Sequence, residues 1–175
     1  MLSASLQKGV SLIELMIGLV ILGILLMVGL PSYSAWIQNT QIRTAAESIS
    51  NGMQLARAEA VRRNTNVQLA FGAASSWTVS VPGGAQIQTR TGDEGSKNVT
   101  VTMTPAGATT VTFNALGRVV ANADASASIT QVDVKVPVAI LSDAQRRDLT
   151  IQVNAGGNVR MCDPKVTDAS DPRKC

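Results

Sequence analysis

Lys8-Gly9-Val10-Ser11-Leu12-Ile13-Glu14-Leu15-Met16 places a single carboxylate, that of Glu14, five residues after a glycine and inside an apolar run. From Val10 to Leu30 no other side chain is acidic or basic. A helix of about 21 residues rises about 1.5 Å per residue and reaches about 31 Å, which is enough to cross the hydrocarbon core of a bilayer. The sequence therefore predicts a membrane-spanning helix over residues 10–30.

Glu14 needs a partner in such a segment. A carboxylate at the centre of a membrane helix costs about 2.5 to 3.5 kcal/mol on insertion scales, so an intramembrane glutamate indicates a function. Cleavage after Gly9 would supply the partner, because the new α-amino group of Val10 would be a cation about one helical turn from the carboxylate of a neighbouring chain.

This arrangement resembles the type IV pilin signature. The resemblance implies that residues 1–9 are a leader, which a prepilin peptidase removes after Gly9, and that the new N-terminus, Val10, is methylated. It also implies that Glu14 aids filament assembly. Most of the family has Phe where this chain has Val10.

Two other interpretations of the N-terminus are a plain membrane anchor and a conventional secretory signal. A removed signal needs small residues at a cleavage site after the apolar run, and Ser32 and Ser34, preceded by Pro31, offer only a weak one. A plain anchor would rarely keep Glu14. The pilin-like leader is the better interpretation of these residues.

The apolar helix continues as an amphipathic one. Small and apolar residues recur at three- and four-residue spacing, a helical period, up to about Asn64. They are Ile42, Ala45, Ile49, Met53, Ala56 and Ala60. The opposite face carries charged residues, namely Arg43, Glu47, Arg57, Glu59 and Arg63. One helix over residues 10–64 is expected, half in the membrane or filament core and half in a domain.

Residues 65–175 change to short β-branched runs separated by turn residues, which predicts an antiparallel sheet or sandwich. The predicted strands are 67–71, 77–81, 99–103, 110–113, 131–138 and 149–153. Pro82-Gly83-Gly84, Gly92-Asp93 and Gly156-Gly157 mark turns, and residues 121–128 are predicted to form a loop. The expected fold class is α+β, with the long helix packed on a β-rich head.

Three parts of the chain resemble the GspH/FimT family of minor pilins and pseudopilins, in particular its FimU-type members. The matching segments are Ala45-Ala46-Glu47 through Leu55-Ala56-Arg57-Ala58-Glu59-Ala60-Val61-Arg62-Arg63, then Phe113-Asn114-Ala115-Leu116-Gly117-Arg118, and Cys162-Asp163-Pro164 with Asp171-Pro172-Arg173-Lys174-Cys175. The resemblance implies a low-abundance subunit at or near the tip of a type IV pilus that helps to initiate assembly. A minor pseudopilin of a type II secretion system and a main pilin are the alternatives.

The same resemblance implies where the protein resides and what it contacts. Its partners would be other major and minor pilins and the prepilin peptidase. It would be held in the inner membrane with its head in the periplasm, and then in a cell-surface pilus or periplasmic pseudopilus.

The chain has two cysteines, Cys162 and Cys175, both close to its C-terminus. In an exported protein such a pair indicates a disulfide, which contributes about 2 to 4 kcal/mol by the loop-entropy account. A closed zinc site would lack ligands, because the chain has no histidine and only two thiols. Without histidine, an activated thiol or a recognisable carboxylate pair, no enzyme activity, catalytic residue, metal or cofactor is expected.

DNA binding for natural transformation is a further alternative, since FimT-type members bind DNA through a Gly-Arg-x-Arg motif. This chain has Gly157-Asn158-Val159-Arg160 at that place, so only Arg160 corresponds. Other candidate contacts are Lys165, Arg173 and Lys174. The net charge of +3 permits phosphate contacts, but Asp163, Asp168 and Asp171 lie among these cations. A mixed-charge, solvated tail is therefore the preferred interpretation.

Overall fold

The computed structural model describes residues 9–175, so residues 1–8 of the predicted leader lie outside the described part. The chain divides into two compact units, one ending at Trp36 and the other running from Ile37 to Cys175. We call the second unit the head. The helix α1 (Leu12–Arg63) contributes residues to both units, and nine strands follow it, all in the head.

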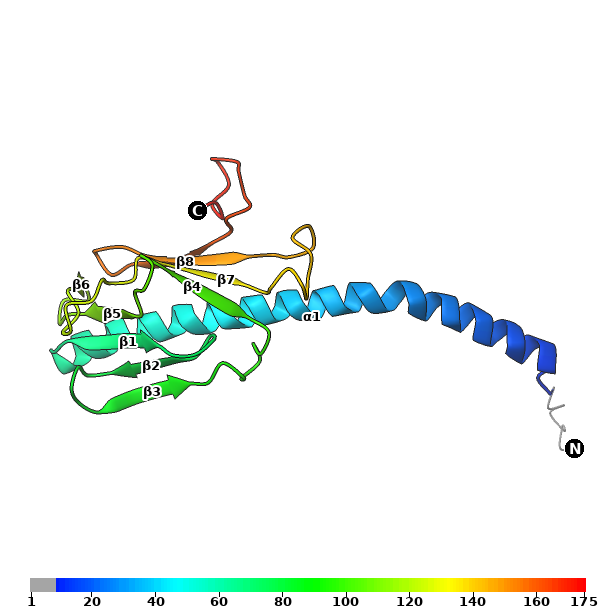
Figure 1. Ribbon diagram of the computed structural model, residues 1–175, viewed down its shortest axis with the longest axis horizontal. Helices are drawn as coiled ribbons and strands as arrows, with labels where there is room; N and C mark the ends of the chain where they lie inside the picture. Colours follow the sequence, from blue (N-terminus) through cyan, green and yellow to red (C-terminus); the bar gives the residue numbers. More distant parts are fainter. Residues whose placement is uncertain (1–8) are drawn as a thin grey trace, which may run out of the picture. The chain divides into compact units, whose positions relative to one another are not determined.

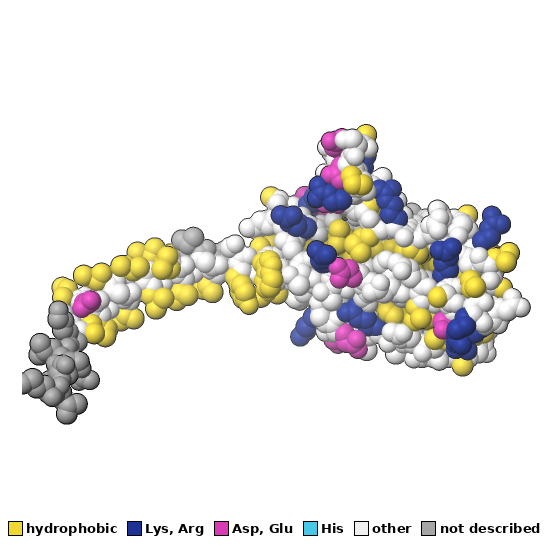
Figure 2. Space-filling view, turned by 180° about the vertical axis from the view of Figure 1, so that it is seen from behind, with side chains coloured by type: hydrophobic (Ala, Val, Ile, Leu, Met, Phe, Trp, Pro, Cys, Tyr) yellow, Lys and Arg dark blue, Asp and Glu magenta, His cyan; other side chains and the backbone are white. Residues whose placement is uncertain are grey.

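The first unit carries an apolar surface that none of the described residues of the chain covers (Figure 2). Its Leu, Ile, Val and Met side chains between Val10 and Leu30, Val28 aside, are 51% to 80% exposed. By its length and composition the helix could cross a membrane, and the span over 10–30 stays a prediction.

The C-terminal end of α1 is closed by a left-handed residue, Asn64, whose φ is 52°. The amide of Asn64 donates to the carbonyl of Val61 at 3.3 Å, and the amide of Thr65 donates to the carbonyl of Ala60 at 3.2 Å. This pair of bonds is the Schellman arrangement, which satisfies carbonyls that the end of a helix leaves open. The predicted helix end at about Asn64 is thus explained by that residue's tolerance of positive φ.

Two antiparallel sheets form the rest of the head. The strands are β1 (Val67–Phe71), β2 (Trp77–Ser80), β3 (Gln86–Arg90), β4 (Thr100–Thr104), β5 (Thr110–Phe113), β6 (Val119–Val120), β7 (Gln131–Lys135), β8 (Leu149–Val153) and β9 (Val159–Cys162). One sheet has the order β3-β2-β1-β5-β6 and the other the order β4-β7-β8-β9. Figure 1 shows β7 and β8 along one side of the head's part of α1 and β1, β2 and β3 along the other. The α+β prediction is confirmed.

The core lies where the apolar stripe of α1 meets these sheets. All six stripe residues predicted from the sequence are fully buried, and so are Val67, Leu69, Val111, Phe113, Val132 and Ile151 from the strands. Gly52 lets the helix approach the first sheet closely, because a Cβ there would lie 3.0 Å from side-chain atoms of both Leu69 and Trp77. The indole N–H of Trp77 donates to the Ser48 hydroxyl at 3.0 Å, which satisfies the one polar atom of that buried ring.

The six predicted strands are all present, three of them with the predicted bounds, namely β1, β5 and β8. The predicted strand over 131–138 ends earlier, at Lys135, because Pro137 begins a turn whose carbonyl accepts the amides of Ile140 and Leu141. The strands β3, β6 and β9 were not predicted. The predicted loop over 121–128 is confirmed, and it is held by the buried amide of Asn122, which donates to the carbonyls of Thr110, Ser126 and Ala127.

Candidate functional sites

The three residues of the N-terminal site predicted from the sequence, Gly9, Val10 and Glu14, all lie in the described part of the chain. Gly9 and Val10 precede α1 and are exposed, and Glu14 lies in the first turn of the helix. A carboxylate in the first turn is favoured by the unpaired N–H groups and the dipole of the helix. Glu14 is exposed as well, so within this single chain its carboxylate has room for a partner from another molecule.

A second site joins α1 to two turns of the head through Arg57. Its Nε donates to the carbonyl of Gly117 at 3.1 Å, and its Nη1 donates to Oδ1 of Asn158 at 3.5 Å. Gly117 lies in the turn between β5 and β6, and Asn158 lies in the turn before β9. Arg57 therefore ties the helix to one turn from each sheet. The sequence pattern had placed Arg57 on the charged, solvated face of the helix; its half-buried position corrects that interpretation.

Gly117 and Gly157 make this junction possible. Both have positive φ, 71° and 78°, a region that residues with a Cβ rarely adopt. A Cβ on Gly157 would overlap the carbonyl oxygen of Gly117, and a Cβ on Gly117 would lie 2.9 Å from Nε of Arg57. The two turns thus approach each other at backbone distance. We call Arg57, Gly117 and Gly157 the turn junction.

Charges beside the junction stabilise the last turns of α1. Glu59 accepts from Arg62 at 2.6 Å and from Arg63 at 2.7 Å. These hydrogen bonds, that of Arg62 first, lower the pKa of Glu59 to about 2. Both arginines also lie in the last turn of the helix, where cations favour the dipole, so their role here is structural.

The C-terminal loop is closed by the predicted disulfide between Cys162 and Cys175. Cys162 is the last residue of β9 and is 2% exposed, so the bond attaches the loop to the edge of the second sheet. Within the loop the amide of Asp163 donates to the carbonyl of Arg173 at 2.7 Å, which holds the two arms together.

The four candidate DNA contacts are engaged in holding this loop. Arg160 donates through Nη2 to the carbonyls of Pro172 at 2.9 Å and Lys174 at 2.5 Å. Lys165 donates to the carbonyls of Asp143 and Arg146, and Lys174 donates to that of Thr167. Arg173 pairs with Asp171 at 2.7 Å and lowers the pKa of that carboxyl to about 2. The structure therefore gives these cations a local structural role.

Replacing Cys162 with Ser should loosen the C-terminal loop and leave the helix and both sheets folded, because the buried stripe of α1 and the strand core do not depend on the disulfide. The loop-entropy account limits the loss to about 3 kcal/mol. Hydrogen exchange should accelerate over residues 163–175 and stay slow in β5 and β8.

The matched control is Cys175→Ser, which breaks the same bond but leaves the buried Cys162 side chain in place. Similar exchange patterns in the two variants would assign the effect to the disulfide. Global unfolding of Cys175→Ser would contradict the prediction.

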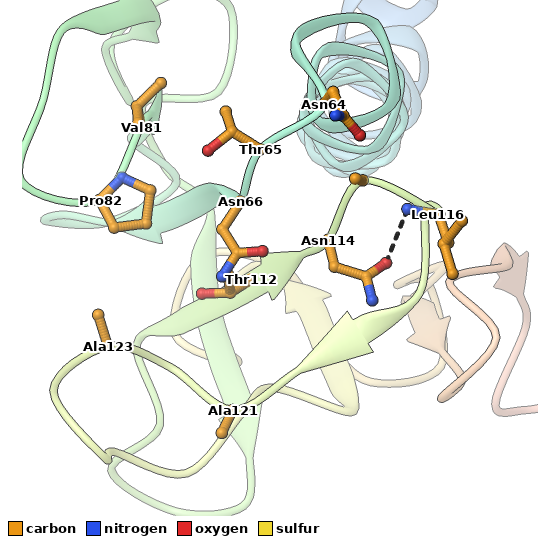
Figure 3. A pocket seen from close by; sticks show the side chains of 11 residues that line it. Asn64, Thr65, Asn66, Val81, Pro82, Thr112, Asn114, Leu116, Ala121 and Ala123 are labelled. Atoms are coloured by element: carbon orange, nitrogen blue, oxygen red, sulfur yellow. Dashed lines mark hydrogen bonds between the residues drawn. The ribbon is translucent and has the colours of Figure 1, made fainter.

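A pocket of about 520 Å³ opens beside the C-terminal end of α1 (Figure 3). Its lining carries no charged side chain and consists of Asn64, Thr65, Asn66, Val81, Pro82, Thr112, Asn114, Ala115, Leu116, Ala121 and Ala123. Oδ1 of Asn114 accepts the amides of Leu116 and Arg118, both at 3.0 Å, so this side chain shapes the turn between β5 and β6. The sequence analysis did not find this pocket, because its lining residues come from four separate parts of the chain.

The fold of this chain is similar to that of a minor pilin of known structure. Two crystal forms of the type IV minor pilin FimU of Pseudomonas aeruginosa (strain PAO1) match with TM-scores of 0.50 and 0.52, at 15% sequence identity. The matches cover 72% and 73% of this chain and 99% and 95% of the FimU chains. At this identity the likeness concerns the fold. No curated protein sequence matches the chain significantly.

Family comparisons cover both the helix and the head. Residues 4–30 match the prokaryotic N-terminal methylation motif, and residues 45–157 match the type II transport protein GspH. The second match includes the whole turn junction and ends before the disulfide loop. It spans more than half of the chain, and the chain therefore belongs to the GspH family of pilin-like proteins.

Proposed function

We propose that this protein is a minor pilin that is incorporated at or near the tip of a type IV pilus and helps to initiate pilus assembly. The observation that carries the proposal is the uncovered apolar surface of residues 10–30 on a chain whose head is fully folded. Burying one such side chain is worth about 1.5 to 3 kcal/mol, so this surface requires a bilayer or the helices of other subunits. A protein that moves from the membrane into a filament uses both in turn.

The N-terminal residues supply the steps of that transition. A prepilin peptidase would cleave between Gly9 and Val10, and methylation would act on the new amino group of Val10. Glu14 would then neutralise the N-terminal amine of a neighbouring subunit, since a carboxylate in apolar surroundings is tolerated only when it is paired. Before assembly the head would lie in the periplasm and the apolar helix in the inner membrane.

The function of such a subunit is contact rather than catalysis. The family is one of filament subunits, and the residues singled out by the geometry hold the backbone: Arg57 binds two turns, and Arg160 and Lys165 bind loop carbonyls. DNA capture by Arg160, Lys165, Arg173 and Lys174 stays a prediction from the sequence. The geometry favours a structural role for these cations over a role in DNA capture.

A minor pseudopilin of a type II secretion system is the second candidate, because the family match is to a type II transport protein. The two functions make different predictions in cells that carry both machines. We expect a tagged full-length chain to co-purify with the minor pilins and to be present in small amounts in sheared pili. Deleting the chain should reduce the number of pili and leave protein secretion unchanged.

Recovery of the tagged chain with secretion pseudopilins, together with loss of secretion on deletion, would replace the pilus proposal with the secretion alternative. The deletion strain complemented with the wild-type gene is the control that separates both effects from expression of neighbouring genes.

A further inference from the structure

Four Lys and Arg side chains within residues 9–175, namely Lys97, Arg118, Lys135 and Arg147, make no hydrogen bond or ion pair inside the chain. All except Arg118 lie at one end of the head. We call this the proximal end and define it as the end at which residues 37–41 of α1 join the head.

Hydrogen bonds to α1 place the first two of these cations. Lys97 precedes Asn98, whose backbone amide donates to Oε1 of Gln41 and whose side chain donates to Oε1 of Gln38, both at 3.1 Å. The backbone amide of Arg147 donates to Oδ1 of Asn39 at 2.8 Å. Both cations are exposed. The residue after Lys97 is bound to this part of the helix, and so is the backbone of Arg147 itself.

The third cation, Lys135, ends β7 beside the loop that carries Arg147. Its carbonyl accepts the Thr100 hydroxyl at 3.1 Å, and the carbonyl of the next residue, Val136, accepts Nη1 of Arg146 at 3.1 Å. Lys135 is thereby joined to the same loop, residues 136–148, that is fastened to Asn39.

The tip of this loop is apolar and exposed. The amides of Ile140 and Leu141 donate to the carbonyl of Pro137 at 2.9 and 3.2 Å, which forms a tight turn. Leu141 is 5% exposed and anchors the turn, whereas Val138 and Ile140 are 68% and 46% exposed. Exposed aliphatic side chains can insert among acyl chains, and unpaired cations can bind anionic headgroups. A loop that carries both kinds of side chain is therefore suited to a lipid surface.

The carboxylates at this end do not cancel the cations. Asp143 and Asp148 both pair with Arg146, at 2.7 and 2.5 Å, and the hydrogen bond that Arg146 donates to Asp148 is the first cause that raises the pKa of Arg146. Asp93 is the one unpaired carboxylate that the described loops place near Lys97. Lys165 also pairs with Asp143, at 3.4 Å, so Asp143 and Asp148 face two cations. Asp133, two residues before Lys135 on β7, accepts from Gln131 and Thr150 and has no cation partner among the described residues. The three unpaired cations therefore outnumber the carboxylates without a cation partner, Asp93 and Asp133, by one.

The chain itself brings this end close to the bilayer in the membrane-held state. Asn39 follows Trp36 by three residues, a chain length of at most about 11 Å in any orientation of the two units. Tyr33 and Trp36 stack with ring centroids 5.9 Å apart and are 60% and 63% exposed, and such aromatic pairs favour the membrane interface. The Debye length at physiological ionic strength is about 8 Å, so charges near Asn39 act on headgroups at that distance.

We infer that the proximal end of the head docks on an anionic lipid surface before assembly, through Lys97, Lys135 and Arg147 and the apolar loop tip of Val138 and Ile140. The inference rests on the proposed function for the membrane-held state. Docking holds the head against the bilayer at the site from which the subunit is taken into the filament. Figure 2 shows Lys and Arg side chains on this end of the head, with Asp and Glu side chains among them.

The test uses the full chain in vesicles with and without phosphatidylglycerol in phosphatidylcholine. An environment-sensitive dye on Ala139→Cys reports the loop tip, since the native cysteines are held in their disulfide. Nitroxide lipids should quench the dye in anionic vesicles and much less in zwitterionic ones, and high salt should reverse the quenching. Arg147→Gln should lower the docking equilibrium about fivefold, the effect of one interfacial cation.

The matched control is Arg118→Gln, which removes an unpaired cation from outside the proximal end and should leave the quenching unchanged. The inference would be overturned if Arg147→Gln and Arg118→Gln reduced the quenching equally. It would also be overturned if the dye stayed in water in the presence of anionic vesicles. A dye whose emission shifts to that of an apolar environment without nitroxide quenching, the more so at higher protein density, would assign the loop tip to a second copy of the chain and would also overturn it. Flotation of the chain with the vesicles is a separate test of the membrane-spanning helix. If the chain floats but its dye stays in water, the docking inference is wrong and the membrane span is not affected.

Discussion

Gly157→Ala should lower the free energy of unfolding by about 3 kcal/mol or more, one of the largest effects that a single added methyl group can have in this chain. Two independent costs act together. Alanine is strained at the φ of 78° that residue 157 adopts, and its Cβ would overlap the carbonyl oxygen of Gly117. Moving that carbonyl would also break its hydrogen bond with Nε of Arg57. Chemical denaturation of the head in the full chain measures the loss.

The neighbouring glycine provides the control. A Cβ on Gly156 would meet only Oδ1 of Asn154, at 3.3 Å, and Gly156 does not have positive φ. Gly156→Ala should therefore cost less than about 1 kcal/mol, an ordinary surface effect. If the two alanine variants unfold at the same denaturant concentration, the turn junction does not stabilise the head and the prediction is wrong.

The contrast between these glycines shows how far the sequence determines the site. Both were predicted as turn glycines, and both lie in the turn before β9. Which of them touches another turn depends on Gly117, 40 residues earlier in the chain, and on Arg57, a further 60 residues away. No local pattern encodes a contact of that kind. For the same reason the sequence pattern placed Arg57 with the other charged residues on the solvated face of the helix.

The fold could be predicted further than the site because its signals are local. The stripe of α1 repeats with the helical period, and β1, β5 and β8 are short β-branched or aliphatic runs between turn residues. The strands that were missed lack such signals: β3 is mostly exposed and polar at the edge of its sheet, and β6 has two residues. Partner strands and loop bonds, rather than their own composition, determine these elements.

The N-terminal residues differ again, because their role depends on other molecules. The spacing of Gly9, Val10 and Glu14 was sufficient for the motif to be identified from the sequence, and the methylation motif match over residues 4–30 agrees with it. Glu14 has an exposed carboxylate in the first turn of α1, without a hydrogen-bond or ion-pair partner among residues 9–175. A test of Glu14 must therefore measure assembly.

Glu14→Ala should leave leader cleavage, membrane insertion and folding of the head intact, and should reduce incorporation into filaments by more than about tenfold. Insertion should not suffer, because the substitution removes a residue that costs about 2.5 to 3.5 kcal/mol in a bilayer. Incorporation should suffer because a carboxylate and an amine about 4 Å apart attract by about 4 kcal/mol at an effective dielectric constant of 20. Loss of even a third of that attraction is about tenfold in an equilibrium.

The measurement compares the processed chain in the membrane fraction with the chain in sheared filaments. Glu14→Gln keeps the size of the side chain and should fail like Glu14→Ala if charge is the cause. Glu47→Ala removes a carboxylate of α1 that pairs with Arg43 at 2.7 Å on the exposed face of the head, and it should assemble normally. Normal filament recovery with Glu14→Ala would show that the apolar surface alone drives incorporation, and the paired-carboxylate role would have to be abandoned.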